Sequence, residues 1–252
     1  MKKLIFLLFF LQLSYVWSLS DADLLKKVDS LASYYGTDFS AEYRILQEKP
    51  GQVPSETVAN VFRRDSNAIY TIVILEPVAS RGEGYIKQGD TLWLYDAGSK
   101  KFKSTSSQDR FQNSNARNSD FTRSTLAEDY EIVIAEDAKL GKTSCRVLTL
   151  ESITTDVTYP RMKVWITAEG LILKSEDYSL SGQLLRTSAM PEYRKIENRY
   201  VPKTIIFIDA LRGTTINGKF VSEKTTISID KVKFGKLPDS TFSKQFLETV
   251  SN

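Results

Sequence analysis

The feature that most constrains the fold is a two-residue alternation of apolar and polar side chains, which recurs in many short segments of the chain. The segment Phe220–Lys231 separates its apolar residues from its charged and hydroxyl-bearing residues in this way. Successive side chains of a β-strand point to opposite faces, so the pattern predicts a strand with one buried face and one wet face. Turn residues such as Pro50-Gly51, Gly89-Asp90 and Asn217-Gly218 separate the segments. We therefore expect a mainly β (α+β) protein built as a long antiparallel meander.

The predicted strands fall into two series. The first occupies residues 39 to 104 and the second residues 130 to 231, and the segment Leu184–Ile196 reads as a single strand of the second series. A helix is expected before the first series, because Leu24, Leu25 and Val28 repeat at helical spacing after Asp21, a residue suited to cap it. A short helix is also expected after Asp239. One domain over residues 21–252 is the simplest organisation for this length.

Some central strands are apolar on both faces. In residues 68 to 75, Tyr70, Ile72 and Ile74 on one face are matched by Val73 and Leu75 on the other. Residues 92 to 95 and 205 to 208 repeat this two-sided pattern. Such strands must be covered on both faces. The second cover could be the opening helix, the flap of residues 106–129, a bound apolar ligand on a curved sheet, or an ordinary second layer of core.

The polar stretch Ser106–Asp129 separates the two series. It holds Phe111, Phe121 and Leu126 among several charged residues. A connection of this length inside a compact domain is typical of a lid, a binding loop or a short-helix insertion. The alternative is a solvated flap whose two phenylalanines are fixed in the core.

The N-terminus has the pattern of an export signal. Lys2 and Lys3 precede the apolar run Leu4–Leu13, which is too short to span a bilayer, and Ser18 and Ser20 offer small residues for cleavage. We expect residues 1–20 to be a signal peptide cleaved after Ser20, or alternatively after Ser18. No lipobox cysteine follows the apolar run. The expected location is therefore the periplasm.

Composition excludes several classes of chemistry. The chain has 34 Lys and Arg residues, 31 Asp and Glu residues and no histidine. Without an imidazole, Ser-His-Asp and Cys-His nucleophiles and the common zinc sites are excluded, and we expect no cofactor and no metal site. Cys145 is the only cysteine, so no intramolecular disulfide forms. The near-balanced charge gives no basic surface for nucleic acid.

Three segments carry a resemblance to a known family. The run Arg81–Tyr95, with its sequence RGEGYIKQGDTLWLY, is followed by Ser106–Phe111 and Asn118–Ser124. Together they resemble the LolA-like superfamily of outer-membrane lipoprotein-sorting proteins, and more closely an uncharacterised LolA-like branch. The resemblance implies an unclosed β-barrel, a curved antiparallel sheet with helices covering its concave face, around a hydrophobic cavity for acyl chains. It covers most of residues 21–252, but no individual site residue of the family is transferred to this chain.

The function implied by the resemblance is that of a carrier without enzymatic activity. It shields the acyl chains of lipoproteins or lipids during transport toward the outer membrane, between an inner-membrane transporter and an outer-membrane acceptor. The candidate lipid-binding residues are the large apolar side chains of the two-sided strands and of the insert. They are Tyr70, Ile72, Ile74, Trp93, Tyr95, Phe111, Phe121, Trp165, Ile206 and Ile208.

Two alternative functions remain open at this stage. The first is a carboxylate-based enzyme, for which the candidates are Glu128-Asp129 with Glu131, and Glu176-Asp177. Adjacent residues on a strand point to opposite faces, so these pairs do not converge on one site. The second is a non-enzymatic envelope module that docks a protein through its sheet edge or through the 106–129 flap. This module predicts an apolar patch without a deep cavity.

Overall fold

The chain is described from a computed structural model, whose described residues are 19–251. The predicted signal peptide, residues 1–20, lies outside this range except for Leu19 and Ser20. The strands of the first series are β1 (Phe39–Glu48), β2 (Ser55–Arg64), β3 (Ile69–Glu76), β4 (Gly84–Gln88), β5 (Thr91–Asp96) and β6 (Lys101–Thr105). Those of the second series are β7 (Tyr130–Leu140), β8 (Thr143–Ser152), β9 (Arg161–Ile166), β10 (Ile172–Tyr178), β11 (Leu184–Ala189), β12 (Tyr193–Ile196), β13 (Arg199–Pro202), β14 (Thr204–Ile216) and β15 (Lys219–Phe234). The α-helices of residues 19–251 are α1 (Asp21–Ala32), α2 (Leu126–Asp129) and α3 (Lys244–Val250).

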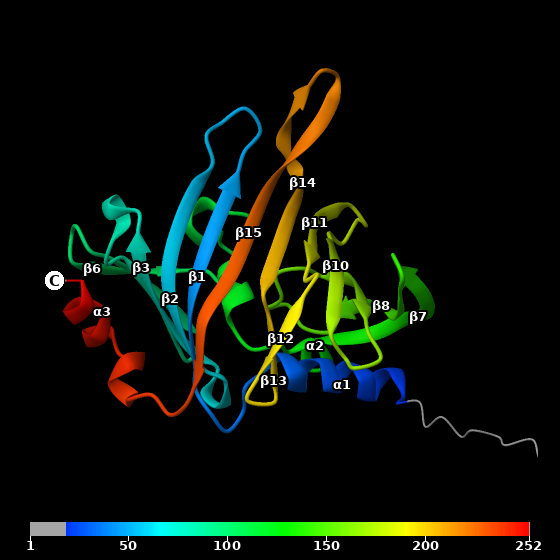
Figure 1. Ribbon diagram of the computed structural model, residues 1–252, viewed down its shortest axis with the longest axis horizontal. Helices are drawn as coiled ribbons and strands as arrows, with labels where there is room; N and C mark the ends of the chain where they lie inside the picture. The colour runs from blue at the N-terminus through cyan, green and yellow to red at the C-terminus, as the bar shows by residue number, and fades with distance from the viewer. Residues whose placement is uncertain (1–18, 252) are drawn as a thin grey trace, which may run out of the picture.

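Within the described residues, 13 of the strands form one antiparallel sheet that is not closed, as the fold prediction stated (Figure 1). Its order is β6-β5-β4-β3-β2-β1-β15-β14-β11-β10-β9-β8-β7, so β6 and β7 are its two edges. The first series is a meander of sequential neighbours, and the second is one too except that β11 pairs with β14. The β1–β15 pair joins the two series. The two edges are therefore also the strands that residues 106–129 connect.

One segment departs from the predicted strand pattern. Leu184–Ile196 was expected to be one strand, but β11 ends at Ala189 and β12 begins at Tyr193. Pro191 lies between them, and proline has no N–H to donate to a central ladder. The chain leaves the sheet there, and β12 forms a separate two-stranded hairpin with β13.

The opening helix α1 begins one residue earlier than the capping signal suggested. Ser20, rather than Asp21, is its N-cap, and the Ser20 hydroxyl accepts a hydrogen bond from the Asp23 N–H at 3.1 Å. Asp21 instead binds Arg146 of β8 at 2.7 Å. The apolar face of α1 packs Leu25 and Val28 against the inner residues of β8 and β9. None of the helices in residues 19–251 has the length and apolar character needed to cross a bilayer.

The two faces of the sheet have separate cores. The inner face, on the side of α1, holds a large aromatic and aliphatic cluster that includes Phe39, Tyr43 and Ile227. On the outer face, α3 covers β3 to β5, and its Leu247 packs with Val73 and Ile86. This cover explains why β3 and β5 are apolar on both sides.

Candidate functional site

Residues 106–129, here called the insert, cross the inner face from edge strand β6 to edge strand β7. Phe111 and Phe121 fix the insert in the inner core, and their ring centroids lie 4.6 Å apart. The Phe111 ring also lies 4.8 Å from that of Tyr85. Both phenylalanine side chains are fully buried. The insert is therefore a packed cover of the sheet rather than a free flap.

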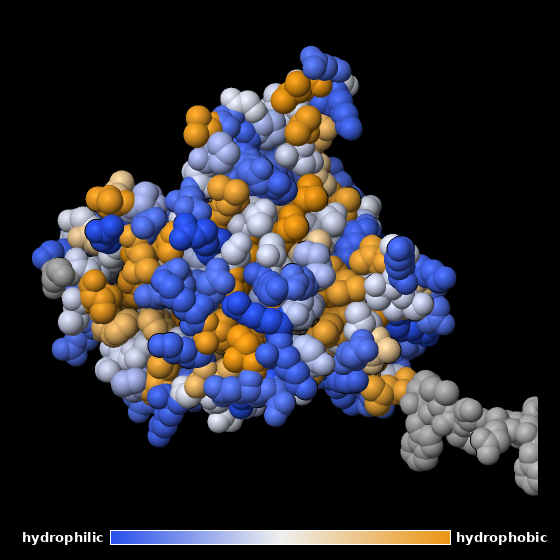
Figure 2. All heavy atoms as spheres, viewed as in Figure 1, coloured by the Kyte–Doolittle hydropathy of each residue, from blue (hydrophilic) through white to orange (hydrophobic). Residues whose placement is uncertain are grey.

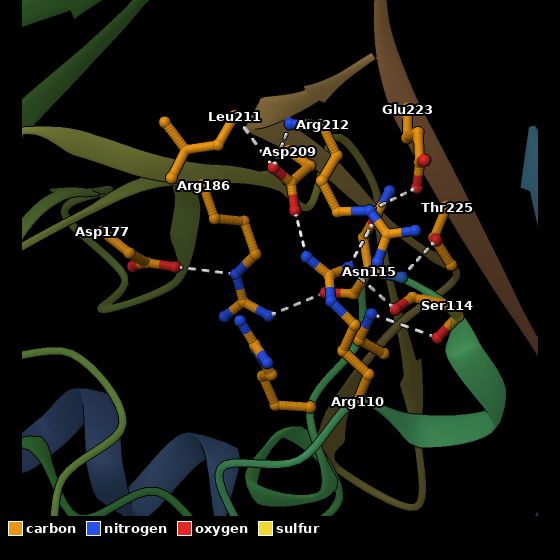
Figure 3. Close-up of polar contacts among 12 residues, drawn as sticks. Arg110, Ser114, Asn115, Asp177, Arg186, Asp209, Leu211, Arg212, Glu223 and Thr225 are labelled. Carbon is orange, nitrogen blue, oxygen red and sulfur yellow. Dashed lines mark hydrogen bonds and ion pairs between the residues drawn. The ribbon is translucent and has the colours of Figure 1, made fainter. Parts of the chain in front are cut away.

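A buried ion cluster holds the insert to β10 and β11. Arg186 of β11 donates to Asp120 of the insert at 2.6 Å and to Asp177 of β10 at 2.8 Å, and its guanidinium lies 4.4 Å from the ring centroid of Phe207. Figure 3 shows the Arg186 side chain directed at Asp177. Burial raises the pKa of the Asp177 carboxyl, while the charge and hydrogen bond of Arg186 act in the opposite direction.

A second ion pair holds the other end of the insert to β14. Arg110 donates to Asp209 at 2.5 Å, and the same carboxylate accepts the backbone N–H groups of Leu211 and Arg212 (Figure 3). Burial opposes ionisation of Asp209, but the hydrogen bonds from Arg110 and from the two amides outweigh it, so the pKa of Asp209 is lowered. Asp209 therefore binds the insert and the backbone of β14 at the same time.

The end of the insert is joined to α1 through Asp29. This carboxylate accepts hydrogen bonds from the Ser124 hydroxyl at 2.5 Å and from the N–H groups of Leu126 and Ala127 at 2.9 and 2.7 Å. Asp29 thus caps the first turn of α2 from a neighbouring helix. Burial nevertheless raises the pKa of Asp29, because desolvation exceeds the effect of these hydrogen bonds.

A cavity of about 790 Å³ lies between α1, the inner face of the sheet and the insert. One wall is largely apolar and comes from α1, the inner face of the sheet and the β12–β13 hairpin. Its residues include Val28, Leu31, Tyr34, Tyr43, Tyr70, Leu92, Met162, Ile172, Met190, Val201, Ile205 and Ile229. The facing wall comes from the insert and is polar. It includes Ser106, Ser107, Gln108, Asn118, Ser119, Asp120, Thr122, Arg123, Ser124 and Thr125.

Four basic residues line the cavity: Arg63, Lys87, Arg123 and Arg186. Lys87 lies in register between Tyr70 and Leu92, and burial lowers the pKa of Lys87, with Asp90 opposing and Arg123 adding to the effect. Arg123 is bound at both terminal nitrogens by Glu128, at 2.7 and 2.9 Å. In the described residues Lys87 has no ion-pair partner within 4.0 Å.

The ten predicted lipid-binding residues divide evenly between the two faces. Tyr70, Ile72, Ile74, Phe111 and Phe121 belong to the inner core, and of these Tyr70 lines the cavity. Trp93 and Tyr95 lie on the outer face with α3. Ile206 and Ile208 alternate with the inner-face residues Ile205 and Phe207, so they lie on the outer face. Trp165 is also on the outer face, where its ring lies between the amino groups of Lys163 and Lys174. The alternation separates the two faces correctly, but on a strand that is apolar on both sides it does not say which face is inner.

Sequence reasoning missed most of the cavity wall. Tyr34 follows the opening helix, and Met190 and Val201 lie in or beside the segment that Pro191 diverts from the sheet. No periodic signal marks these positions. Ile229 was detectable, because it lies in the cleanest alternating strand and on the face that is buried there.

Three side chains that could take part in catalysis are either bound to basic residues or buried. Glu128 binds Arg123, Glu176 binds Lys174 at 2.6 Å, and Cys145 is buried with a raised pKa caused by desolvation. Residues 19–251 hold no group of three or more acidic or cysteine side chains placed to bind a metal ion.

Three solved structures are similar to the chain over 90% of its length. A LolA superfamily protein from Nitrosomonas europaea is 24% identical, with a TM-score of 0.76 and 99% of that chain covered. A protein described as an outer membrane lipoprotein-sorting protein domain, from Vibrio parahaemolyticus, is 19% identical, with a TM-score of 0.76 and 97% of that chain covered. A DUF1329 family protein from Desulfovibrio piger is 16% identical, with a TM-score of 0.78 and 97% covered. These similarities establish a shared fold.

No curated protein matches the chain. A family model described as an uncharacterized protein matches residues 66–249, which is most of the sequence. This match includes the insert and both of the strands that it connects. The chain therefore belongs to this family of uncharacterized proteins, and it shares its fold with the LolA superfamily protein.

Proposed function

We propose that the protein is a non-enzymatic periplasmic carrier that shields the acyl chains of a lipoprotein or lipid during transport toward the outer membrane. The observation that carries this proposal is the cavity of about 790 Å³ on the inner face, with its apolar wall. Concave sites with mostly apolar walls and a few polar groups are typical of small-molecule binding. The fold shared with a lipoprotein-sorting domain is consistent with this function.

The energetics of acyl chains explain why a carrier needs an enclosed wall. Burial of one methylene is worth ~0.8 kcal/mol, so leaving about 15 methylenes in water costs roughly 12 kcal/mol. The aliphatic and tyrosine side chains of the sheet and of α1 supply such a shield. The contacts are non-directional, and they suit chains of different length.

The polar wall indicates an amphiphilic cargo. Serine, threonine and amide side chains of the insert face the apolar wall, and Lys87 stands beside them. A ligand with both an acyl chain and a polar group satisfies the two walls at once, whereas a pure hydrocarbon leaves the insert side unpaired. The proposed partners remain an inner-membrane transporter and an outer-membrane acceptor, and export depends on the N-terminal segment.

The proposal is tested by native mass spectrometry, with organic extraction, of the protein purified from its own periplasm without detergent. We expect acylated species bound at near-stoichiometric levels. A lipid-free protein that also fails to take up a fluorescent fatty-acid probe would contradict the proposal.

A matched pair of variants tests whether the cavity is the binding site. Ala32 and Ala22 are both exposed alanines of α1, but only Ala32 lines the cavity. Ala32→Trp should reduce probe uptake by filling the cavity, and Ala22→Trp should not. Equal uptake by the two variants would place binding elsewhere.

One observation supports the alternative function, an envelope module that docks a protein through its sheet edge. Val133 and Ile134 are exposed on β7, an edge strand with one free side. Such an edge accepts an added strand from a partner. Two results together would favour the docking module over the carrier. The purified protein would be free of lipid but retain an envelope partner on affinity purification, and the Ile134→Lys variant would lose that partner.

A further inference from the structure

The hairpin of β14 and β15 extends beyond the rest of the sheet (Figure 1). The last β1 partner of β15 is Lys224, which pairs with Glu48, and the last β11 partner of β14 is Asp209, which pairs with Arg186. Beyond these positions the two strands pair only with each other, from the Gly213–Ser222 pair to the Ile216–Lys219 pair. Residues 210–223, here called the ribbon, therefore project by roughly 17 Å at about 3.4 Å per residue.

The ribbon exposes large apolar side chains from its base to its turn. Leu211 is 52% exposed, Phe220 48% and Ile216 40%, and Val221 is also exposed. Figure 2 shows hydrophobic atoms at this projecting end of the molecule. A water-exposed two-stranded ribbon has no core to explain these residues.

The apolar residues lie on both faces of the ribbon. Ile216 pairs with Lys219 and Thr214 with Val221, so Ile216 and Val221 share one face. Phe220 lies on the opposite face over Gly213, where an added Cβ would be 2.7 Å from the Phe220 ring. A protein partner docked on one face would leave the other face exposed, whereas a lipid interface surrounds the tip.

Apart from Glu223 at its base, the charged residues of the ribbon are basic. Residues 210–222 include Arg212 and Lys219 and no acidic residue. Arg212 lies 3.3 Å from Glu223 at the base, while Lys219, beside the Asn217-Gly218 turn, has no ion pair with any described residue. A basic residue near an anionic membrane surface contributes about 1 kcal/mol to binding, or roughly a fivefold change in affinity.

The base of the ribbon is fixed. Asp209 accepts the N–H groups of Leu211 and Arg212, and it also binds Arg110 of the insert. The ribbon therefore starts from a defined support beside the insert, and Figure 3 shows these contacts at its base.

We propose that the ribbon tip is a membrane-docking element that inserts Ile216 and Phe220 into the interface of an anionic lipid surface, with Lys219 among the head groups. Insertion is shallow, because the outer backbone groups of a two-stranded ribbon have no partners in hydrocarbon. This function goes beyond cargo binding, since it concerns where the protein docks and not what its cavity holds.

The test is co-sedimentation of the full mature protein with vesicles of phosphatidylglycerol and phosphatidylcholine, compared with phosphatidylcholine alone. We expect stronger binding to the anionic vesicles. Phe220→Ser and Ile216→Ser should each weaken it about tenfold or more, since burying a large apolar side chain is worth ~1.5–3 kcal/mol. Lys219→Gln should weaken it about fivefold on anionic vesicles and leave binding to neutral vesicles unchanged.

Val250→Ser is the matched control. The exposed fraction of Val250, 42%, is similar to that of Ile216. Val250 lies on α3, however, which is away from the ribbon (Figure 1). It should bind vesicles as the wild type does. The proposal is overturned if the wild type shows no preference for anionic vesicles, or if the ribbon variants bind as Val250→Ser does. Phe220 packs on Gly213, so the Ile216 and Lys219 variants decide the question if Phe220→Ser does not fold.

Discussion

Two segments cover the inner face of the sheet, and they are held by different interactions. α1 packs Leu24, Leu25 and Val28 against β8 and β9, and its Asp21–Arg146 ion pair is partly exposed. The insert adds a buried ion cluster to its two phenylalanines. Apolar surfaces can separate without leaving an unpaired charge, whereas separation of the insert leaves Asp177 and Arg186 incompletely paired. We therefore expect α1, rather than the insert, to move when the cavity opens.

The largest expected effect is that of breaking the insert's buried cluster. Arg186→Met leaves Asp120 and Asp177 buried without their cation, which should lower the free energy of unfolding by about 3–5 kcal/mol. Urea denaturation measures this loss. Arg44→Met, which removes the solvent-exposed pair with Glu56, is the control and should have little effect. Comparable small losses in both variants would mean that the cluster does not hold the insert.

Removal of an apolar contact from α1 should have the next largest effect. Leu25→Ala creates a cavity under the helix and should cost about 2–4 kcal/mol. If α1 opens separately, hydrogen exchange should speed up in α1 while the amides around Phe121 keep their protection. Lys26→Ala, on the exposed side of the same helix, is the control. Equal acceleration in both covers would show that they open together and would remove the distinction between them.

The same comparison shows how far the sequence specifies the molecule. Strand alternation and turn residues suffice for β1 to β6, because these strands pair with neighbours that follow directly in the chain. The route of the insert is different, since it joins β6 and β7, which are consecutive strands in sequence and opposite edges in space. That arrangement depends on the β1–β15 pairing between residues near opposite ends of the chain, which local patterns do not encode.

The candidate site was predictable only in part, for a related reason. Tyr70 and Tyr95 each belong to a strand that is apolar on both sides, and only the position of α3 assigns Tyr95 to the outer face. Arg186 and Asp177 lie on neighbouring strands, yet the third member of their cluster, Asp120, comes from a loop whose path the sequence leaves open. Covers that arrive from distant parts of the chain therefore decide which residues form the cavity.

A smaller effect is expected at the joint between the two covers. Asp29→Ala removes the cap that α1 provides to Leu126 and Ala127, and loss of such a cap costs about 1 kcal/mol. Uptake of a fatty-acid probe should become faster, because α1 then parts from the insert more easily, and stopped-flow fluorescence measures this rate. Asp23→Ala, an exposed carboxylate on the same helix, should leave the rate unchanged. An unchanged rate in Asp29→Ala would place the opening elsewhere.

The smallest effect concerns the Asp21–Arg146 pair, which should make the attachment of α1 sensitive to acid. Hydrogen bonds from Arg146 lower the pKa of Asp21 below its ordinary value of 3.8, against a weaker opposing effect of burial. A lowered pKa means that the pair's contribution to stability is fully present above pH 3.8 and is lost as the pH falls through the lower folded-state pKa. A double-mutant cycle with Asp21→Asn and Arg146→Gln, followed by urea denaturation from neutral pH to pH 3, should give a small coupling energy that declines only at the acid end. A coupling that stays constant to pH 3 would mean that ionisation of Asp21 does not contribute to the attachment of α1.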